Sequence, residues 1–318
     1  MTWSTLFSRL NVFQKTALIT IAVTFLLIFI GGLVRATGAG LGCPDWPKCF
    51  GLWIPPLSAA DLPAPYDPAE FNVFKTWMEY VNRLVGVVVG FLILLTFLFS
   101  FRYLSRSTPV FLGALLAFVL VLFQGWLGGR VVLSGLEGYM ITLHMVTALV
   151  ILNVLVWTYY RSVRDRITFT LEAPVRRKLT VVLVLFLLVM FIQIVLGTQV
   201  REGLEAVKAA YPGLERGSWI DRVGWVDDVH RSFSWVVLIL AFLFQLLVRR
   251  FNAEPYLRLL ALLTTASVVL QIAVGAGLVY LAIPPAFQVL HLWIAAFSTV
   301  VLFVALLLVA DASKRKTV

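Results

Sequence analysis

Eight long apolar stretches are the feature that most limits what this chain can fold into. The hydrocarbon core of a bilayer is about 30 Å thick, and a helix needs roughly 20 mostly apolar residues to cross it. With 61% hydrophobic and only 13% charged residues, the chain is too apolar for a collagen-like, disordered or disulfide-scaffold protein. We therefore predict an all-α integral membrane protein. The eight spans are expected at residues 15–35, 80–101, 109–129, 140–160, 179–200, 230–249, 257–279 and 287–309.

The distribution of charge predicts which side of the membrane each segment faces. Eight spans place both termini on one side, and the segments on that side carry 16 of the 26 lysines and arginines. Because loops rich in Lys and Arg stay in the cytoplasm, we expect the N- and C-termini to be cytoplasmic and the long loops 36–79 and 202–229 to face outward. The net charge of +10 then reflects topology, so its partner is the lipid bilayer and not nucleic acid.

The start of the chain bears on its location. Arg9 and Lys15 flank the beginning of a first span that is too long for a cleaved signal and has no small-residue cleavage site, so we expect this span to be retained. An amphipathic leader rich in Arg and Ser is also missing. Both observations favour the plasma membrane of a bacterium over import into an organelle.

The two halves of the chain resemble each other. Gly31-Gly-Leu-Val-Arg35 is similar to Gly197-Thr-Gln-Val-Arg201. The other corresponding pairs are Glu79 and Asp227, Asn82 and His230, Gln124 and Gln271, Gly128 and Gly275, and His144 and His291. Four helices per repeat give both halves the same orientation. We therefore predict two tandem four-helix bundles related by a parallel internal repeat, an N-terminal bundle over residues 1–165 and a C-terminal bundle over residues 166–318.

All three histidines of the chain fall at the outer end of an even-numbered span. His230 and His291 belong to the same half, and two imidazoles from facing helices can take both axial positions of a haem. Arg201 and Arg231 lie at the matching level, where they can pair with haem propionates. The alternatives are that each histidine is a hydrogen-bonded packing residue, that the arginines extend to lipid head groups, or that the three histidines bind zinc.

The N-terminal half departs from this symmetry, because Asn82 occupies the position of His230 and His144 therefore lacks an imidazole partner. An open iron position suits dioxygen chemistry, whereas two strong axial ligands suit electron transfer. Glu79, Asn82 and Arg83 share one helix face, so a carboxylate would lie one turn from the incomplete site. The alternative is that Glu79 is an acid of the first helical turn, stabilised by the helix dipole, as the matching position of Asp227 would also suggest.

Two cysteines lie in the first outer loop, in Cys43-Pro-Asp-Trp-Pro-Lys-Cys49. Outside the cytoplasm the environment is oxidising, so a disulfide is expected. Free thiols and metal binding are the alternatives; a metal site is disfavoured because no histidine lies near the pair.

Four groups of residues resemble the signature motifs of the haem A synthase family: residues 31–49, residues 79–83, Asp228-Val-His-Arg231, and the Leu-His pairs that end at His144 and His291. The resemblance covers the whole chain. It implies oxidation of the C8 methyl group of haem O to the formyl group of haem A by successive hydroxylations, for assembly of terminal oxidases. It also implies a haem b between His230 and His291 in the C-terminal half.

The resemblance further implies that the N-terminal half holds the substrate haem, with Glu79 as the catalytic acid and with His144, Asn82, Arg83 and Arg35 around the substrate. Asn82 is a departure, since the commoner family pattern has histidine there. Haem O would come from a haem O synthase, and the electron donor is open, as is a homo-oligomer. The alternatives are a paralogue without turnover and a non-catalytic haem b cytochrome that transfers electrons.

Overall fold

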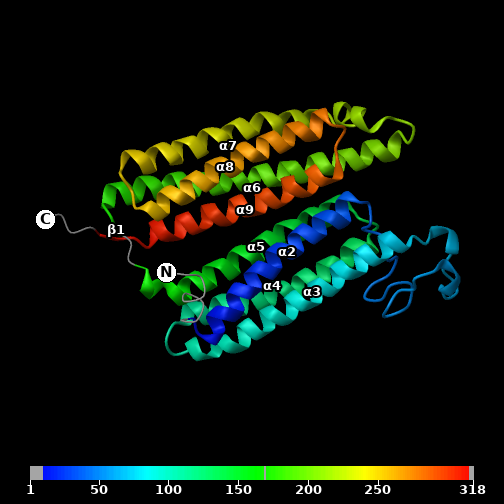
Figure 1. The fold of residues 1–318 in the computed structure, drawn as a ribbon, viewed down its shortest axis with the longest axis horizontal. Coiled ribbons are helices and arrows are strands. Elements are labelled where there is room, and N and C mark those ends of the chain that lie inside the picture. The colour runs from blue at the N-terminus through cyan, green and yellow to red at the C-terminus, as the bar shows by residue number, and fades with distance from the viewer. Residues whose placement is uncertain (1–9, 168–169, 315–318) are drawn as a thin grey trace. The chain divides into compact units, whose positions relative to one another are not determined.

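A computed structural model describes residues 10–167 and 170–314 of the chain. Within these residues, eight α-helices are long and apolar enough to cross a membrane (Figure 1), which confirms the predicted all-α membrane fold. The helices are α2 (Val12–Ala36), α3 (Val73–Ser100), α4 (Thr108–Leu133), α5 (Gly138–Val163), α6 (Ala173–Ala210), α7 (Trp225–Arg250), α8 (Pro255–Tyr280) and α9 (Pro285–Ala310).

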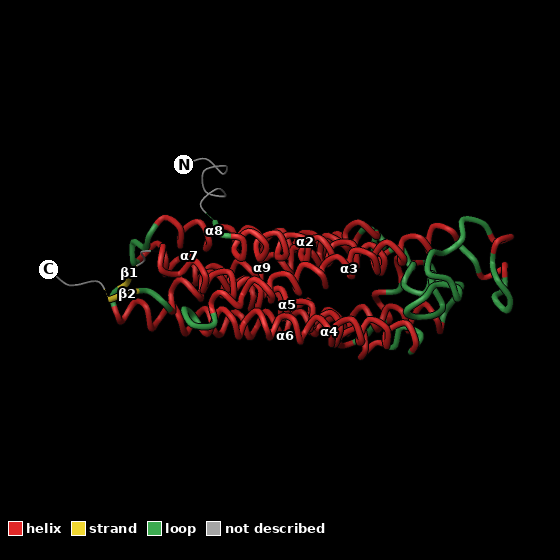
Figure 2. The backbone as a smooth tube through the Cα atoms, turned by 90° about the horizontal axis from the view of Figure 1, so that it is seen from below, coloured by secondary structure: helices red, strands yellow, loops and turns green. Residues whose placement is uncertain are grey.

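The chain divides into two compact units between Ser162 and Val163. The first unit contains α2 to α5 and the second contains α6 to α9, and the helices of each unit run lengthwise beside one another (Figures 1 and 2). Short 3-10 turns and loops join the helices and form the ends of each bundle.

All four helices of the first unit contribute to its core. Val89 and Ile93 of α3 are buried with Ala117 of α4 and with Leu155 of α5, and apolar side chains of α2, among them Leu27, pack against this group. A polar contact joins α2 to α3 at the same depth, where the hydroxyls of Thr20 and Thr96 are 3.0 Å apart. In a membrane such hydrogen bonds and close packing hold helices together, since lipid tails are as apolar as the side chains.

The second unit has a larger core, in which Leu183 and Phe186 of α6 are buried with Phe244 of α7, Leu257 of α8 and Leu302 of α9. The segments before the first and after the last helix of this unit pair with each other at one end of the bundle. Strand β1 (Thr170–Leu171), which precedes α6, pairs in parallel with strand β2 (Ser313–Lys314), which follows α9. Arg164 forms an ion pair of 3.1 Å with Asp311 beside them.

The two long loops are shorter than predicted, because the helices beside them are longer. Helix α3 begins at Val73, where the side chain of Asn72 accepts a hydrogen bond of 3.0 Å from the amide of Lys75, so Glu79 is helical and the first loop covers residues 37–72. Helix α6 continues to Ala210, and Arg201 and Glu205 form an ion pair of 2.5 Å one turn apart in this extension. Such pairs stabilise exposed helix, which apolar periodicity alone does not detect.

Candidate functional site

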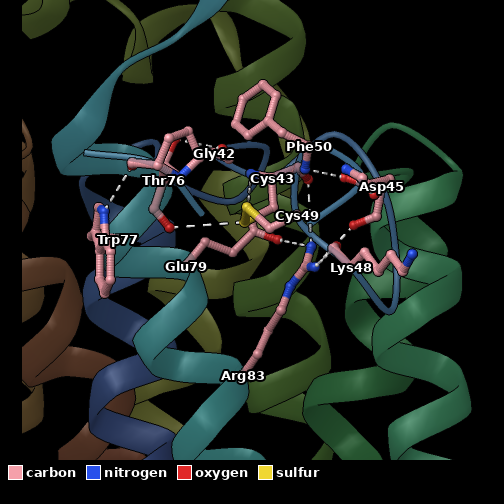
Figure 3. The surroundings of a disulfide bond; sticks show 12 residues. Gly42, Cys43, Asp45, Lys48, Cys49, Phe50, Thr76, Trp77, Glu79 and Arg83 are labelled. Carbon is pink, nitrogen blue, oxygen red and sulfur yellow. Dashed lines mark hydrogen bonds and ion pairs between the residues drawn. A yellow bond between two sulfur atoms is a disulfide. The ribbon is translucent and has the colours of Figure 1, made fainter. Parts of the chain in front are cut away.

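The loop between α2 and α3 folds around a disulfide. Cys43 and Cys49 are bonded, with 2.00 Å between the sulfur atoms, and both are buried together with Phe50. The disulfide predicted from the sequence is confirmed, and the alternatives of free thiols and metal ligation are wrong. Figure 3 shows that this loop lies against the first turns of α3.

Glu79 of α3 points into the disulfide loop and is only 3% exposed. Its Oε2 accepts a hydrogen bond of 2.9 Å from the amide of Cys43, and its Oε1 lies 2.5 Å from the guanidinium of Arg83 (Figure 3). Near it the hydroxyl of Thr76 donates to the carbonyl of Gly42 at 2.8 Å. A Cβ on Gly42 would stand 2.3 Å from the carbonyl oxygen of Lys75, so only glycine permits this approach of loop to helix.

Arg83 connects Glu79 to the rest of the loop. Its guanidinium donates to the carbonyl oxygens of Asp45 at 2.9 Å, Lys48 at 2.8 Å and Cys43 at 3.4 Å (Figure 3). The resemblance to the haem A synthase family implies a place for Arg83 around the substrate haem. In the structure these contacts make it the link between the buried carboxylate and the loop backbone.

The helix dipole does not account for Glu79. Helix α3 has no acidic residue in its first turn, and Glu79 lies in its second turn. Asp227, the corresponding residue, does lie in the first turn of α7, where a helix dipole favours an acid. The first-turn alternative is therefore wrong for Glu79, and only Asp227 lies where it would apply.

In the second unit, His230 of α7 and His291 of α9 lie close together. Their ring centroids are 6.3 Å apart with an angle of 68° between the ring planes. A bond from imidazole to a transition metal is about 2.0 Å long and the ring centroid lies about 1.1 Å behind the bonded nitrogen, so two rings on opposite sides of one ion would have centroids about 6.2 Å apart. The Nδ1 atoms of both rings are enclosed and have no hydrogen-bond partner within the described residues. The pair fits two axial ligands of one haem.

The corresponding positions of the first unit are His144 of α5 and Asn82 of α3. The Nδ1 of His144 and the Oδ1 of Asn82 are enclosed and lack hydrogen-bond partners in the part of the chain that the structure describes. A Cβ on Gly31 of α2 would lie 3.8 Å from the Asn82 oxygen. Two enclosed polar groups with unused capacity fit a ligand site, and only one of them is an imidazole.

The arginines predicted to meet propionates have protein partners in the structure. Arg201 pairs with Glu205 at 2.5 Å. Arg231 contacts Asp227 at 2.6 Å and Asp228 at 3.1 Å, with half of its side chain exposed. Arg35 lies in the last turn of α2. In the second unit a propionate would therefore meet arginines that neighbouring acids already hold.

Three glutamines contact the histidine helices, and their role was missed in the sequence. Gln124 and Gln271 serve there only as markers of the repeat, and Gln193 goes unnoticed. Each donates its amide to the backbone carbonyl of one histidine: Gln124 to His144 at 3.0 Å, Gln193 to His230 at 3.0 Å and Gln271 to His291 at 2.8 Å. The detectable signal is the spacing Gln-x-x-x-Gly, which precedes each histidine by one helix.

Comparison with known proteins places the chain in a family. The family model described as cytochrome oxidase assembly protein matches residues 14–306. A protein of Shewanella oneidensis named Heme A synthase is 28% identical over 301 residues, covering 86% of this chain and 89% of that protein. Proteins with the same name from Azorhizobium caulinodans (29% over 336 residues, 93% of each chain) and Bradyrhizobium diazoefficiens (31% over 260 residues, 69% and 70%) are also similar. The chain therefore belongs to the haem A synthase family of cytochrome oxidase assembly proteins.

Proposed function

We propose that this chain is a haem A synthase, a haem-dependent membrane oxidoreductase that oxidises the C8 methyl group of haem O to a formyl group by successive hydroxylations. The product, haem A, would serve the assembly of terminal oxidases. The observation that carries the proposal is the unequal pair of ligand sets, with two imidazoles 6.3 Å apart in the second unit and one imidazole with an asparagine in the first. The names of the relatives support the same activity.

The second unit would hold a haem b and the first unit would hold the substrate haem. His230 and His291 would hold a haem b, which supplies one-electron transfer when bound. His144 would hold the iron of the substrate haem from one side, and the amide of Asn82, a weaker ligand than imidazole, would leave the other side accessible. The ring edges of both sites would lie among apolar helices that exclude water, and Arg35, Arg201 and Arg231 would meet the propionates by charge-assisted hydrogen bonds.

Glu79 would act on the substrate from the second turn of α3, one turn from Asn82 on the same helix face. The Cys43 amide and Arg83 fix the carboxylate, which supports a fixed position for it in the proposed site. A carboxylate held in this way can accept or return a proton, or stabilise positive charge that develops nearby. Both roles need the carboxylate, so the amide of glutamine would not replace it.

The proposed location is the plasma membrane of a bacterium, with both haem sites toward the outer side. Haem O would be supplied by a haem O synthase, and hydroxylation calls for an external electron donor. The loops at the histidine ends of the bundles contain the disulfide, which fits an oxidising compartment.

The test is to co-express the chain with a source of haem O, extract the haems and identify them by mass. We expect haem A together with the singly hydroxylated intermediate, and neither in cells that carry the haem O source alone. If the folded, haem-loaded protein yields only haem b and unmodified haem O, the chain is instead a haem b cytochrome that transfers electrons. A protein with no bound haem would contradict both functions.

A further inference from the structure

Each of the three helices that carry a histidine accepts the same kind of hydrogen bond from the helix that precedes it. Gln124 of α4 binds the carbonyl of His144 in α5, Gln193 of α6 binds that of His230 in α7, and Gln271 of α8 binds that of His291 in α9. These carbonyls lie within helices, where each already accepts an intrahelical bond. A carbonyl oxygen has two lone pairs, so the glutamine amide adds a second hydrogen bond without opening the helix.

A glycine follows each glutamine by four residues, which places it one turn further along the same helix face. The Cβ that Gly128 lacks would stand 3.4 Å from Cε1 of His144, and the corresponding distances are 3.1 Å from Gly197 to His230 and 3.3 Å from Gly275 to His291. An added methyl group would press on the imidazole in the two closer cases. On one helix face, the glutamine amide thus bonds to the backbone of the histidine, and the glycine leaves room for the edge of its ring.

The glutamines bond to the backbone and not to the imidazole rings, and no residue that the structure describes bonds to the Nδ1 atoms of these rings. The Nδ1 atoms of His144, His230 and His291 are enclosed and without partners. In most metal-binding histidines the second ring nitrogen donates to a neighbouring acceptor, which sets the orientation of the ring. Here the glutamine and the glycine are the contacts that set where the ring stands.

The remaining helix pair of the first unit, α2 and α3, has the glycine but neither the glutamine nor the histidine. Gly31 is present there, but the residue four positions before it is Leu27, which packs in the apolar core. The facing residue is Asn82 and not a histidine. In this chain the glutamine therefore occurs at each imidazole and is absent at the position without one.

We propose that Gln124, Gln193 and Gln271 are positioning residues for the haem-ligating histidines. The amide of each glutamine fixes the helical turn that carries the ligand. Each imidazole ring packs against the glycine one turn further along, which is Gly128, Gly197 or Gly275. The inference rests on the proposed function, since it assumes that these histidines bind haem iron. It adds that the strength of ligation is set by the neighbouring helix. In the second unit both ligands of one iron are held in this way.

The test uses carbon monoxide, which binds reduced haem only where an axial ligand gives way. The full-length protein is purified with its haem in a His144→Ala background, so that the second unit supplies the signal. Gln271→Met and Gln193→Met remove the amide donor and keep the side-chain length. We expect each to raise the fraction of reduced haem that binds carbon monoxide on the order of fivefold, which the modest strength of an interhelical hydrogen bond in a membrane allows.

The matched control is Gln245→Met, which removes a buried glutamine of the same unit that lies on α7. We expect it to bind carbon monoxide as the parent does. If the Gln271 and Gln193 variants retain haem and also match the parent, the inference is wrong. Should either variant fail to fold, Gly275→Ala decides instead, because it leaves the hydrogen bond intact and acts only on the ring. Unchanged carbon monoxide binding in folded Gly275→Ala would overturn the inference, and increased binding would support it.

Two further variants separate this inference from the function on which it rests. His230→Ala and His291→Ala are expected to lose the low-spin haem spectrum of the second unit. If they retain the haem content and spectrum of the parent, the proposed haem site is wrong. If they lose the spectrum while the glutamine variants behave as the parent, the haem site stands and only the positioning role is wrong.

Discussion

Glu79 and Asp227 occupy corresponding positions in the two units, and each has an arginine four residues later, yet their surroundings differ. The side chain of Arg83 is 15% exposed, whereas that of Arg231 is 51% exposed. Glu79 also accepts a hydrogen bond from the Cys43 amide, and Arg83 binds three loop carbonyls. Arg231 is shared instead with Asp228 on its own helix.

The difference comes from the loops. Residues 37–72 of the first unit form a disulfide-bonded loop over the carboxylate, while the second unit has only residues 211–224 between α6 and α7. Both carboxylates are buried, at 3% exposed each, but only in the first unit is the arginine of the pair also largely covered and the carboxylate bonded to a loop. A motif that recurs in both halves of the sequence thus has different surroundings in the two units.

The largest expected effect concerns the ligands of the first unit. We predict that His144→Ala abolishes haem A production, whereas Asn82→Ala retains a substantial part of it, because in the proposed site the imidazole would be the firm ligand and the amide the weak one. Haem extraction and mass analysis of both variants would measure this. Equal loss in the two would mean that Asn82 has a role beyond weak ligation.

The next effect compares the two carboxylates directly. Glu79→Gln is expected to lower the rate of haem A formation by about 100-fold or more, the range for loss of a group that transfers protons. Asp227→Asn should lower it by less than about tenfold, since that acid lies in the first turn of its helix, which favours a negative charge, and pairs with Arg231 of the same helix. Initial rates with matched haem content would distinguish them. Similar rates for both variants would mean that the enclosure of Glu79 has no catalytic consequence.

A third comparison concerns stability. Arg83→Gln leaves the buried carboxylate of Glu79 without its charge partner and frees three loop carbonyls, so we expect a loss of about 3 kcal/mol in the free energy of unfolding. Arg231→Gln also leaves a buried acid, since Asp227 is 3% exposed, but Arg231 is half exposed and holds no loop carbonyls, so we expect a smaller loss of about 1 kcal/mol. Denaturant-induced unfolding in detergent, followed by circular dichroism, would measure both. Equal losses would show that the loop of the first unit does not shield the pair.

Much of this fold follows from the sequence, because membrane spans depend on local apolar content. The helix beyond residue 200 could not be found in that way, since its stability comes from ion pairs such as Arg201 with Glu205. The histidines are predicted as site residues because they recur at matching positions of the two halves, at the outer ends of even-numbered spans. The glutamines that contact them were not interpreted, because a hydrogen bond between two helices depends on their packing, which no single helix reveals.

Glu79 shows the same limit. The sequence supplied the carboxylate and the arginine at i+4, and both the helix-dipole and the catalytic interpretations fitted. The start of α3 at Val73 removes the helix-dipole interpretation, and the approach of the loop at Gly42 gives Glu79 its buried surroundings, while the catalytic interpretation stays a prediction. These depend on contacts between segments more than 30 residues apart, as in the bond from the Cys43 amide to Glu79.

The smallest expected effect concerns the disulfide, which only the first unit has among the described residues. Replacing Cys43 and Cys49 by serine removes a crosslink that closes a short loop, and the entropy model gives a loss of about 2 kcal/mol in unfolding free energy. The Cys43 amide should then hold Glu79 less firmly, so the rate of haem A formation should fall, but by less than in Glu79→Gln. Unfolding and rate measurements on the double variant, with reduced wild-type protein as the matched control, would test this. If the double variant loses stability but keeps the full rate, the loop stabilises the first unit without positioning the carboxylate, and the difference between the two units would then rest on Arg83.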